Sequence, residues 1–125
     1  MAGRIAGQGS KWIRPVKRLA IYARDGFACV YCGSAMESGA RLTLDHVVPC
    51  LLGGNNEATN LVTACLACNS AKQARSVTEF AMILADRGVN PDLIGDRVRK
   101  QTGKDLAAYM VTARAIEAAR RVSVE

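Results

Sequence analysis

The sequence is poor in several residue types, and each shortage excludes something. It has one histidine, one tryptophan, two phenylalanines and three tyrosines, so a core must be built mainly from aliphatic side chains. It has no run of eighteen or more apolar residues, which argues against a membrane-spanning helix. Its first residues, MAGRIAGQGSKWIRP, lack the apolar block of a signal peptide. We therefore expect a protein of the cytoplasm with no membrane partner.

The residues that are abundant indicate one compact domain with a preference for anions. Half of the 125 residues are hydrophobic, which is enough for a single core over residues 1–125. Lysine and arginine outnumber acidic residues by 17 to 11, giving a net charge of +6. Such a charge favours a polyanionic partner, but charge alone fits a merely basic protein equally well.

Four of the five cysteines form two C-x-x-C pairs, Cys29 with Cys32 and Cys65 with Cys68. Disulfide frameworks are rare in the cytoplasm, so metal binding is the better interpretation. Four thiolates suit a tetrahedral zinc ion and close its coordination shell, which predicts a structural metal. An iron–sulfur cluster could use the same four residues. The fifth cysteine, Cys50, has no such partner and is predicted to be a small buried apolar residue.

Local patterns predict a mixed order of elements followed by helices. The expected elements are a disordered tail at 1–10, a helix at 13–24, a strand running into a turn at 27–33, a strand at 41–48, a loop at 53–60 and a helix at 66–75. Helices are then expected at about 76–88, 90–103 and 105–121, the first opened by a Ser76–Glu79 capping box. Arg14, Lys17 and Arg18 lie on the basic face of the first helix, which suits either solvent or phosphate.

The only histidine, His46, directly follows Asp45, and Asn69 follows the last cysteine. Hydrolysis of a phosphodiester needs a base for the attacking water and positive charge for the phosphate and the leaving oxygen. A carboxylate and an amide oxygen can hold Mg²⁺ or Mn²⁺, and an imidazole can act as the base. A lone histidine is more often an ordinary structural residue, so these residues become persuasive only within a larger pattern.

That pattern is a resemblance to a known family. The stretches CVYCG, DHVVP, GGNNEATNLV and CLACNSAK resemble the zinc-containing, four-cysteine branch of the HNH endonucleases over residues 24–72. The resemblance implies an α+β protein with a ββα-metal core, in which two antiparallel strands and a helix surround one catalytic ion. We expect this core at 11–75, including an N-terminal helix, and a helical C-terminal extension at 76–125.

The resemblance also implies a role for each matching residue. His46 would be the general base, Asp45 would bind the catalytic metal, and Asn60 would brace the loop and help to orient the base. Asn69 stands where the last histidine of the motif usually lies, so the chain is an HNN variant in which Asp45 and Asn69 hold Mg²⁺ or Mn²⁺. Lys72 would contact a phosphate. The remaining predicted phosphate contacts are Arg75, Arg14, Lys17 and Arg18.

The function expected from this resemblance is that of a metal-dependent endonuclease that nicks double-stranded DNA. Adjacent strand residues face opposite sides, so Asp45 and His46 can serve one centre only if their strand ends or twists there. One alternative is a zinc-stapled nucleic-acid-binding module without catalysis, and another is a zinc-ribbon protein-interaction domain. Proteins of phage packaging or of defence systems are the expected biological partners. The oligomeric state is left open.

Overall fold

The computed structural model describes residues 13–124, and the tail predicted at 1–10 lies outside them. One helix precedes a small two-stranded sheet and four helices follow it, which confirms the α+β class. The elements are α1 (Pro15–Arg24), β1 (Leu42–His46), β2 (Leu61–Cys65), α2 (Leu66–Lys72), α3 (Val77–Ala85), α4 (Pro91–Thr102) and α5 (Ala107–Val124), with short 3₁₀ turns at Met36–Ser38, Cys50–Leu52 and Ala58–Asn60. Among the described helices, none is both long and apolar enough to cross a membrane.

The sheet is a two-stranded antiparallel ribbon of β1 and β2. Leu42 pairs with Cys65 at one end and His46 with Leu61 at the other. β1 ends at His46, two residues before the predicted end, so the strand stops where the two candidate catalytic residues stand. β2 runs directly into α2, and the three elements form the ββα arrangement that the family resemblance implies.

The strand predicted at 27–33 is not formed. Ala28 makes only an isolated bridge with Ala35, and the Gly33 amide donates to the Cys29 carbonyl oxygen at 2.8 Å. Gly33 takes a φ of 83°, a left-handed conformation that side chains other than glycine's rarely adopt. The prediction was wrong because the turn begins earlier than the alternating pattern suggested, and it curls the first cysteine pair into a knuckle.

A buried ion pair joins α1 to β2. Arg24 and Asp25 are almost fully buried, with Nε of Arg24 2.8 Å from Oδ1 of Asp25. The arginine also donates to the carbonyl oxygens of Leu61 and Ala58, and the aspartate accepts from the Thr63 amide. Each of these partners is a backbone group or the opposite charge. The pair is therefore buried with its polar groups hydrogen-bonded. It fixes the register of the helix against the strand that follows the candidate active-site loop.

The helices α3 and α4 share a core with the cysteine-bearing half. Phe80 and Leu84 of α3 and Ile94 and Val98 of α4 belong to one buried cluster with Tyr31 and the cysteines at 29, 65 and 68. The rings of Tyr31 and Phe80 meet edge to face with their centroids 5.2 Å apart. The division expected at residue 75 therefore runs through a shared core, since burial of the cysteine knuckle needs the helices that follow.

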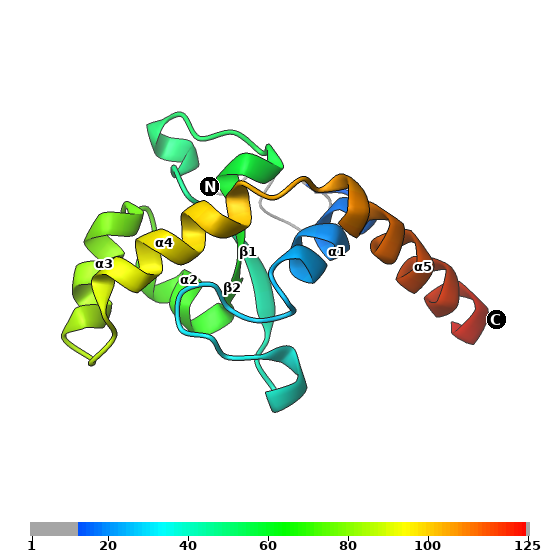
Figure 1. The fold of residues 1–125 in the computed structure, drawn as a ribbon, viewed down its shortest axis with the longest axis horizontal. Helices are drawn as coiled ribbons and strands as arrows, with labels where there is room; N and C mark the ends of the chain where they lie inside the picture. The colour runs from blue at the N-terminus through cyan, green and yellow to red at the C-terminus, as the bar shows by residue number, and fades with distance from the viewer. Residues whose placement is uncertain (1–12, 125) are drawn as a thin grey trace.

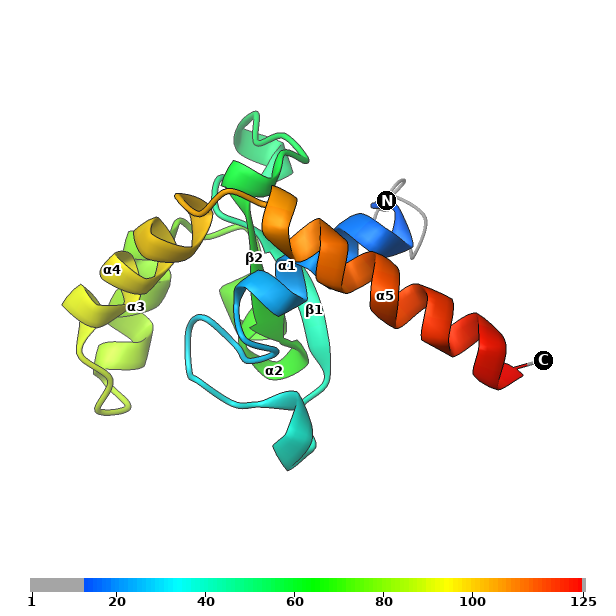
Figure 2. The same cartoon turned by 45° about the vertical axis from the view of Figure 1, so that its right-hand side comes forward.

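A second cluster lies on the other side of the sheet. It contains Ile13, Ile21, Leu44 and Leu61, with Leu106 packed against it. Figure 1 shows α3 and α4 on one side of the strands and α1 with α5 on the other, and Figure 2 keeps the same order after rotation. Beyond its contact with α1, α5 extends away from the body of the protein in both views. Each face of the ribbon is thus covered, and the loop between the strands stays at the edge.

Candidate active site and metal centre

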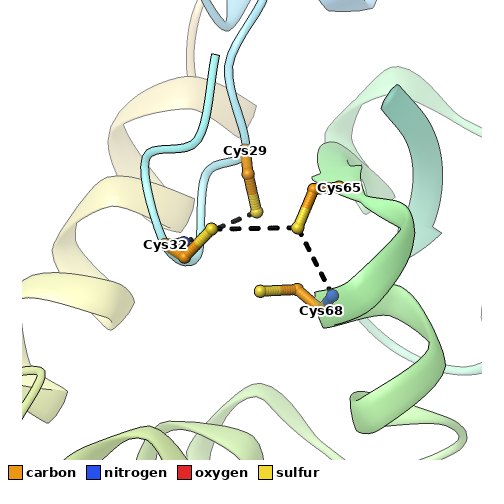
Figure 3. Close-up of side chains that lie close together, drawn as sticks. All are labelled: Cys29, Cys32, Cys65 and Cys68. Carbon is orange, nitrogen blue, oxygen red and sulfur yellow. Dashed lines mark hydrogen bonds between the residues drawn. The ribbon is translucent and has the colours of Figure 1, made fainter. Parts of the chain in front are cut away.

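The four cysteines of the two pairs converge, as Figure 3 shows. All four Sγ atoms lie within 4.8 Å of one another, and those of Cys32 and Cys65 are 3.8 Å apart. A tetrahedral zinc ion with Zn–S bonds of about 2.3 Å requires sulfur atoms about 3.8 Å apart. The donor set and its spacing therefore fit one thiophilic metal ion, and among the described residues no other group of at least three His, Cys, Asp or Glu side chains could hold one.

The backbone around the cysteines favours negatively charged sulfur. The amides of Cys32 and Cys68 point at the Sγ atoms of Cys29 and Cys65 at 3.5 and 3.4 Å. A hydrogen bond with Cys68 lowers the pKa of the Cys29 thiol to about 5, and the same bond raises the pKa of Cys68. The Cys68 thiol proton thus lies toward the Cys29 sulfur, and burial raises the pKa of Cys65 as well, so a thiophilic ion would displace thiol protons on binding.

Asp45 lies buried between the first knuckle and α2. Its side chain is 6% exposed, and Oδ2 accepts from the Tyr31 hydroxyl at 2.5 Å and from the Lys72 ammonium at 3.0 Å. Burial raises the pKa of Asp45, while the Lys72 charge and the Tyr31 hydrogen bond act in the opposite direction. Within the described part of the chain, no residue donates to Oδ1. The carboxylate therefore has one oxygen engaged and one available.

Lys72 corrects one of our expectations. The prediction placed its ammonium on a DNA phosphate, but its side chain is fully buried. Nζ donates to the His46 carbonyl oxygen at 3.1 Å and pairs with Asp45. The last turn of α2 faces β1, so the lysine neutralises a buried carboxylate, and solvent-borne phosphate cannot reach it in this conformation.

Asn69, one turn earlier on α2, lies against the same strand. Its Nδ2 donates to Thr43 Oγ1 at 2.8 Å and to the Leu44 carbonyl oxygen at 3.2 Å. These two bonds fix the orientation of the amide, and no described residue donates to its Oδ1. Asn69 therefore lies against the stretch of β1 that carries Asp45, and each of the two residues has an oxygen atom that no described residue uses.

His46 points toward the loop that follows β1. Nε2 lies 2.7 Å from Asn56 Oδ1 and 3.4 Å from Cys50 Sγ, and the residue is 7% exposed. Cys50 is exposed, so the prediction of a buried apolar cysteine was wrong. The 3₁₀ turn that follows Pro49 carries this thiol outward beside the imidazole, a placement that its spacing from the other cysteines could not reveal.

Asn60 braces the same loop. Oδ1 accepts from the Val48 amide at 2.8 Å, and Nδ2 donates to the carbonyl oxygens of Val48 and Asn55 at 3.1 and 2.9 Å. Gly54 passes so close that an added Cβ would lie 1.7 Å from the Val48 carbonyl oxygen. The two ends of the loop are therefore tied together, and the glycine is needed because a larger residue has no room.

The predicted basic contacts differ in what they bind. Arg14 and Arg75 are exposed, and Arg75 donates to the Ala71 carbonyl oxygen. Lys17 donates to the Asn56 carbonyl oxygen at 2.8 Å, and Arg18 donates to the Tyr22 hydroxyl at 3.2 Å.

Sequence reasoning also missed residues that contact the site. Tyr31 lies between two cysteines and was interpreted only as part of the knuckle, yet its hydroxyl reaches Asp45. Asn56 was interpreted only as part of a polar loop, yet its side chain contacts His46. No periodic pattern marks either residue, and the only available signal was the proximity of each to a motif in the sequence.

Comparison with known proteins gives a match to one family model and to a solved structure. Residues 29–84 match the family model described as HNH endonuclease, and none of the curated proteins matches the chain. Among solved structures, the crystal structure of the Type II-C Cas9 enzyme from Actinomyces naeslundii is similar, with a TM-score of 0.55 and 26% sequence identity. The match covers 86% of this chain and 13% of that chain, so this chain corresponds to a small part of the larger enzyme.

These findings place the likeness to known nucleases in one segment of the chain. The predicted resemblance to HNH endonucleases is confirmed over residues 29–84, and so is the helix-and-strand fold with a small two-stranded sheet. The matched family model describes an endonuclease, and the Cas9 neighbour is a much longer enzyme.

Proposed function

We propose that this chain is a metal-dependent endonuclease that nicks double-stranded DNA. The observation that carries the proposal is that Asn69 lies against the stretch of β1 that carries Asp45, and each of the two residues has an oxygen that accepts no hydrogen bond from a described residue. A carboxylate and an amide oxygen are hard donors that suit Mg²⁺ or Mn²⁺ better than softer metals. When bound, such an ion would supply positive charge to the phosphate and to the departing 3′ oxygen.

The imidazole of His46 would take the proton of the attacking water. Its ring is held at the end of β1 by the loop at residues 50–56, which Asn60 ties to Val48. A base that is fixed before substrate arrives loses little entropy in the reaction, which is how positioning lowers a barrier. Products with a 5′-phosphate and a 3′-hydroxyl follow from the family resemblance.

The four-cysteine centre would hold zinc and act structurally. Four thiolates fill a tetrahedral shell and leave no position for substrate, so this ion would join the first knuckle to the β2–α2 junction without taking part in hydrolysis. The exposed guanidinium groups of Arg14 and Arg75 would bind the DNA backbone, which predicts affinity that falls with salt. Phage packaging and defence systems are the settings in which we place such a protein.

A second candidate is a zinc-stapled nucleic-acid-binding module without catalysis. The burial of the Asp45–Lys72 pair favours it, because a buried ion pair with hydrogen-bonded partners can serve structure alone. This module would bind DNA in a salt-sensitive manner and would not cut it.

Plasmid nicking by the purified, zinc-loaded protein tests the proposal. Supercoiled DNA should become open circles with Mg²⁺ or Mn²⁺ and stay supercoiled when these ions are absent. His46→Gln, which keeps a polar side chain at a buried position, should lose at least about a hundredfold in rate, as expected for removal of a general base. DNA binding and thermal unfolding of this variant should be close to those of the native protein. Equal nicking by both proteins would overturn the assignment of the base, and binding without any nicking would favour the binding module.

A further inference from the structure

The contact between His46 and Asn56 bears on which ring nitrogen carries the proton. Nε2 and the amide Oδ1 are 2.7 Å apart, which is the length of a strong hydrogen bond. An amide oxygen only accepts, so with the Asn56 amide in this orientation Nε2 is the donor, because two facing lone pairs at this distance would repel each other. A neutral imidazole with its proton on Nε2 has its unprotonated lone pair on Nδ1.

Asn56 is itself held from two directions, although it lies in an exposed loop. Lys17 of α1 donates from Nζ to its carbonyl oxygen at 2.8 Å. The carbonyl oxygen of the preceding residue, Asn55, accepts from Asn60 at 2.9 Å. These bonds anchor the backbone on both sides of the Asn56 peptide, so its side chain can reach the imidazole with less loss of entropy than a free loop would require.

Cys50, the second neighbour of the imidazole ring, has a weaker influence on the direction of the Nε2–H bond. Cys50 Sγ lies 3.4 Å from Nε2, and sulfur is a weak acceptor of hydrogen bonds. The Asn56 oxygen is both closer and the stronger acceptor, so it sets the direction of the Nε2–H bond. Among the described residues, Asp45 precedes His46, the Lys72 ammonium binds the His46 carbonyl oxygen, and the Lys17 ammonium binds the backbone of Asn56.

We propose that Asn56 is a positioning residue that fixes the tautomer and the ring orientation of His46, so that Nδ1 is the atom that receives the proton from water. The inference deepens the proposed function and rests on it for the catalytic role of the ring. It differs from the role expected of Asn60, whose side chain ties the loop to Val48 and Asn55.

Nitrogen-15 NMR can test the tautomer directly, because His46 is the only histidine in the chain. Zinc-loaded protein labelled at histidine should give one pair of ring signals at mildly alkaline pH. In the native protein we expect Nε2 at the position of a protonated nitrogen, with a slowly exchanging proton attached. Asn56→Leu, of similar size but without an acceptor, should lose that slow exchange and shift both nitrogens toward the average of two tautomers. Glu57→Gln changes an exposed side chain of the same loop, and it should keep the native pattern.

Kinetics supply a second readout. Asn56→Leu should lower kcat for nicking by about ten- to a hundredfold with KM nearly unchanged, because the substrate still binds while the base is misoriented. Asn56→Asp keeps an acceptor oxygen and should retain more of the native kcat than Asn56→Leu. A native Nδ1–H tautomer, or an unchanged ring spectrum in Asn56→Leu, would overturn the inference even if the enzyme cuts DNA. A changed spectrum in a protein that never nicks DNA would uphold the hydrogen bond and reject the proposed function.

Discussion

Replacing Lys72 by methionine discriminates sharply between the expected and the observed role of this residue. Methionine retains much of the side-chain length and removes the charge. The Asp45 carboxylate would then stay 6% exposed with only the Tyr31 hydroxyl as a donor. Removal of one partner from a buried ion pair costs about 3–5 kcal/mol, which is a large share of the roughly 5–15 kcal/mol that stabilises a typical domain. We therefore expect Lys72→Met to lower the free energy of unfolding by about 3 kcal/mol or more.

The pH dependence of that loss has a definite sign. Burial raises the pKa of Asp45, and removal of Lys72 raises it further. The folded protein then binds a proton that the unfolded chain has already released, so stability falls as pH rises through this window. The cost of Lys72→Met should be smaller at mildly acidic pH than at mildly alkaline pH. Asp45→Asn in the same background removes the buried charge and should recover most of the loss.

Denaturant unfolding at a fixed free zinc concentration measures these differences, and Arg75→Met is the matched control. Arg75 lies three residues further on and is exposed, so its replacement should change stability by at most about 0.5 kcal/mol while weakening DNA binding. The reasoning is refuted if Lys72→Met keeps native stability and instead lowers DNA affinity and its salt dependence, which is the behaviour of a phosphate contact.

Other predictions follow from the metal centre and from the glycines. A strong zinc chelator, or Cys65→Ser, should unfold much of the protein, since structural zinc sites contribute about 10–16 kcal/mol in small peptides. Cys50→Ser should leave the thermal midpoint nearly native. Circular dichroism and a zinc-release assay compare this variant with Cys65→Ser. The absence of visible-range absorption in the native protein would exclude an iron–sulfur cluster. Gly54→Ala should cost more than about 1 kcal/mol and slow nicking, because its Cβ would clash with the Val48 carbonyl oxygen. Gly95→Ala, inside a helix where the Cβ meets only the Arg99 side chain, should stabilise by about 0.5–1 kcal/mol. Similar thermal midpoints for the two alanine variants would contradict this account.

Features with a local cause were predictable from the sequence. The Ser76–Glu79 capping box forms as expected, with both reciprocal hydrogen bonds present. Asn90 and Pro91 open α4, where the Asn90 side chain accepts from the Asp92 amide. These signals depend on residues two or three positions apart, so neighbouring elements do not alter them. The wrong prediction of a strand at 27–33 shows where local patterns stop being informative. A metal-binding knuckle and a short strand use the same small apolar residues, so the pattern does not distinguish them.

The candidate site divides in the same way. The sequence alone determined which atoms could hold the thiophilic ion and which family the motif resembles, because four thiol groups at two short spacings have few other uses. Only the tertiary structure decided which charges are buried and which atoms meet. Spacing placed Lys72 on the same face of α2 as Asn69, but the packing of that face against β1 turned the lysine inward to Asp45. The loop carries Asn56 back to His46 over ten residues, a contact set by the braces at Lys17 and Asn60. A helix or a turn is encoded by its own residues, whereas burial and long-range hydrogen bonds depend on every element that packs around them.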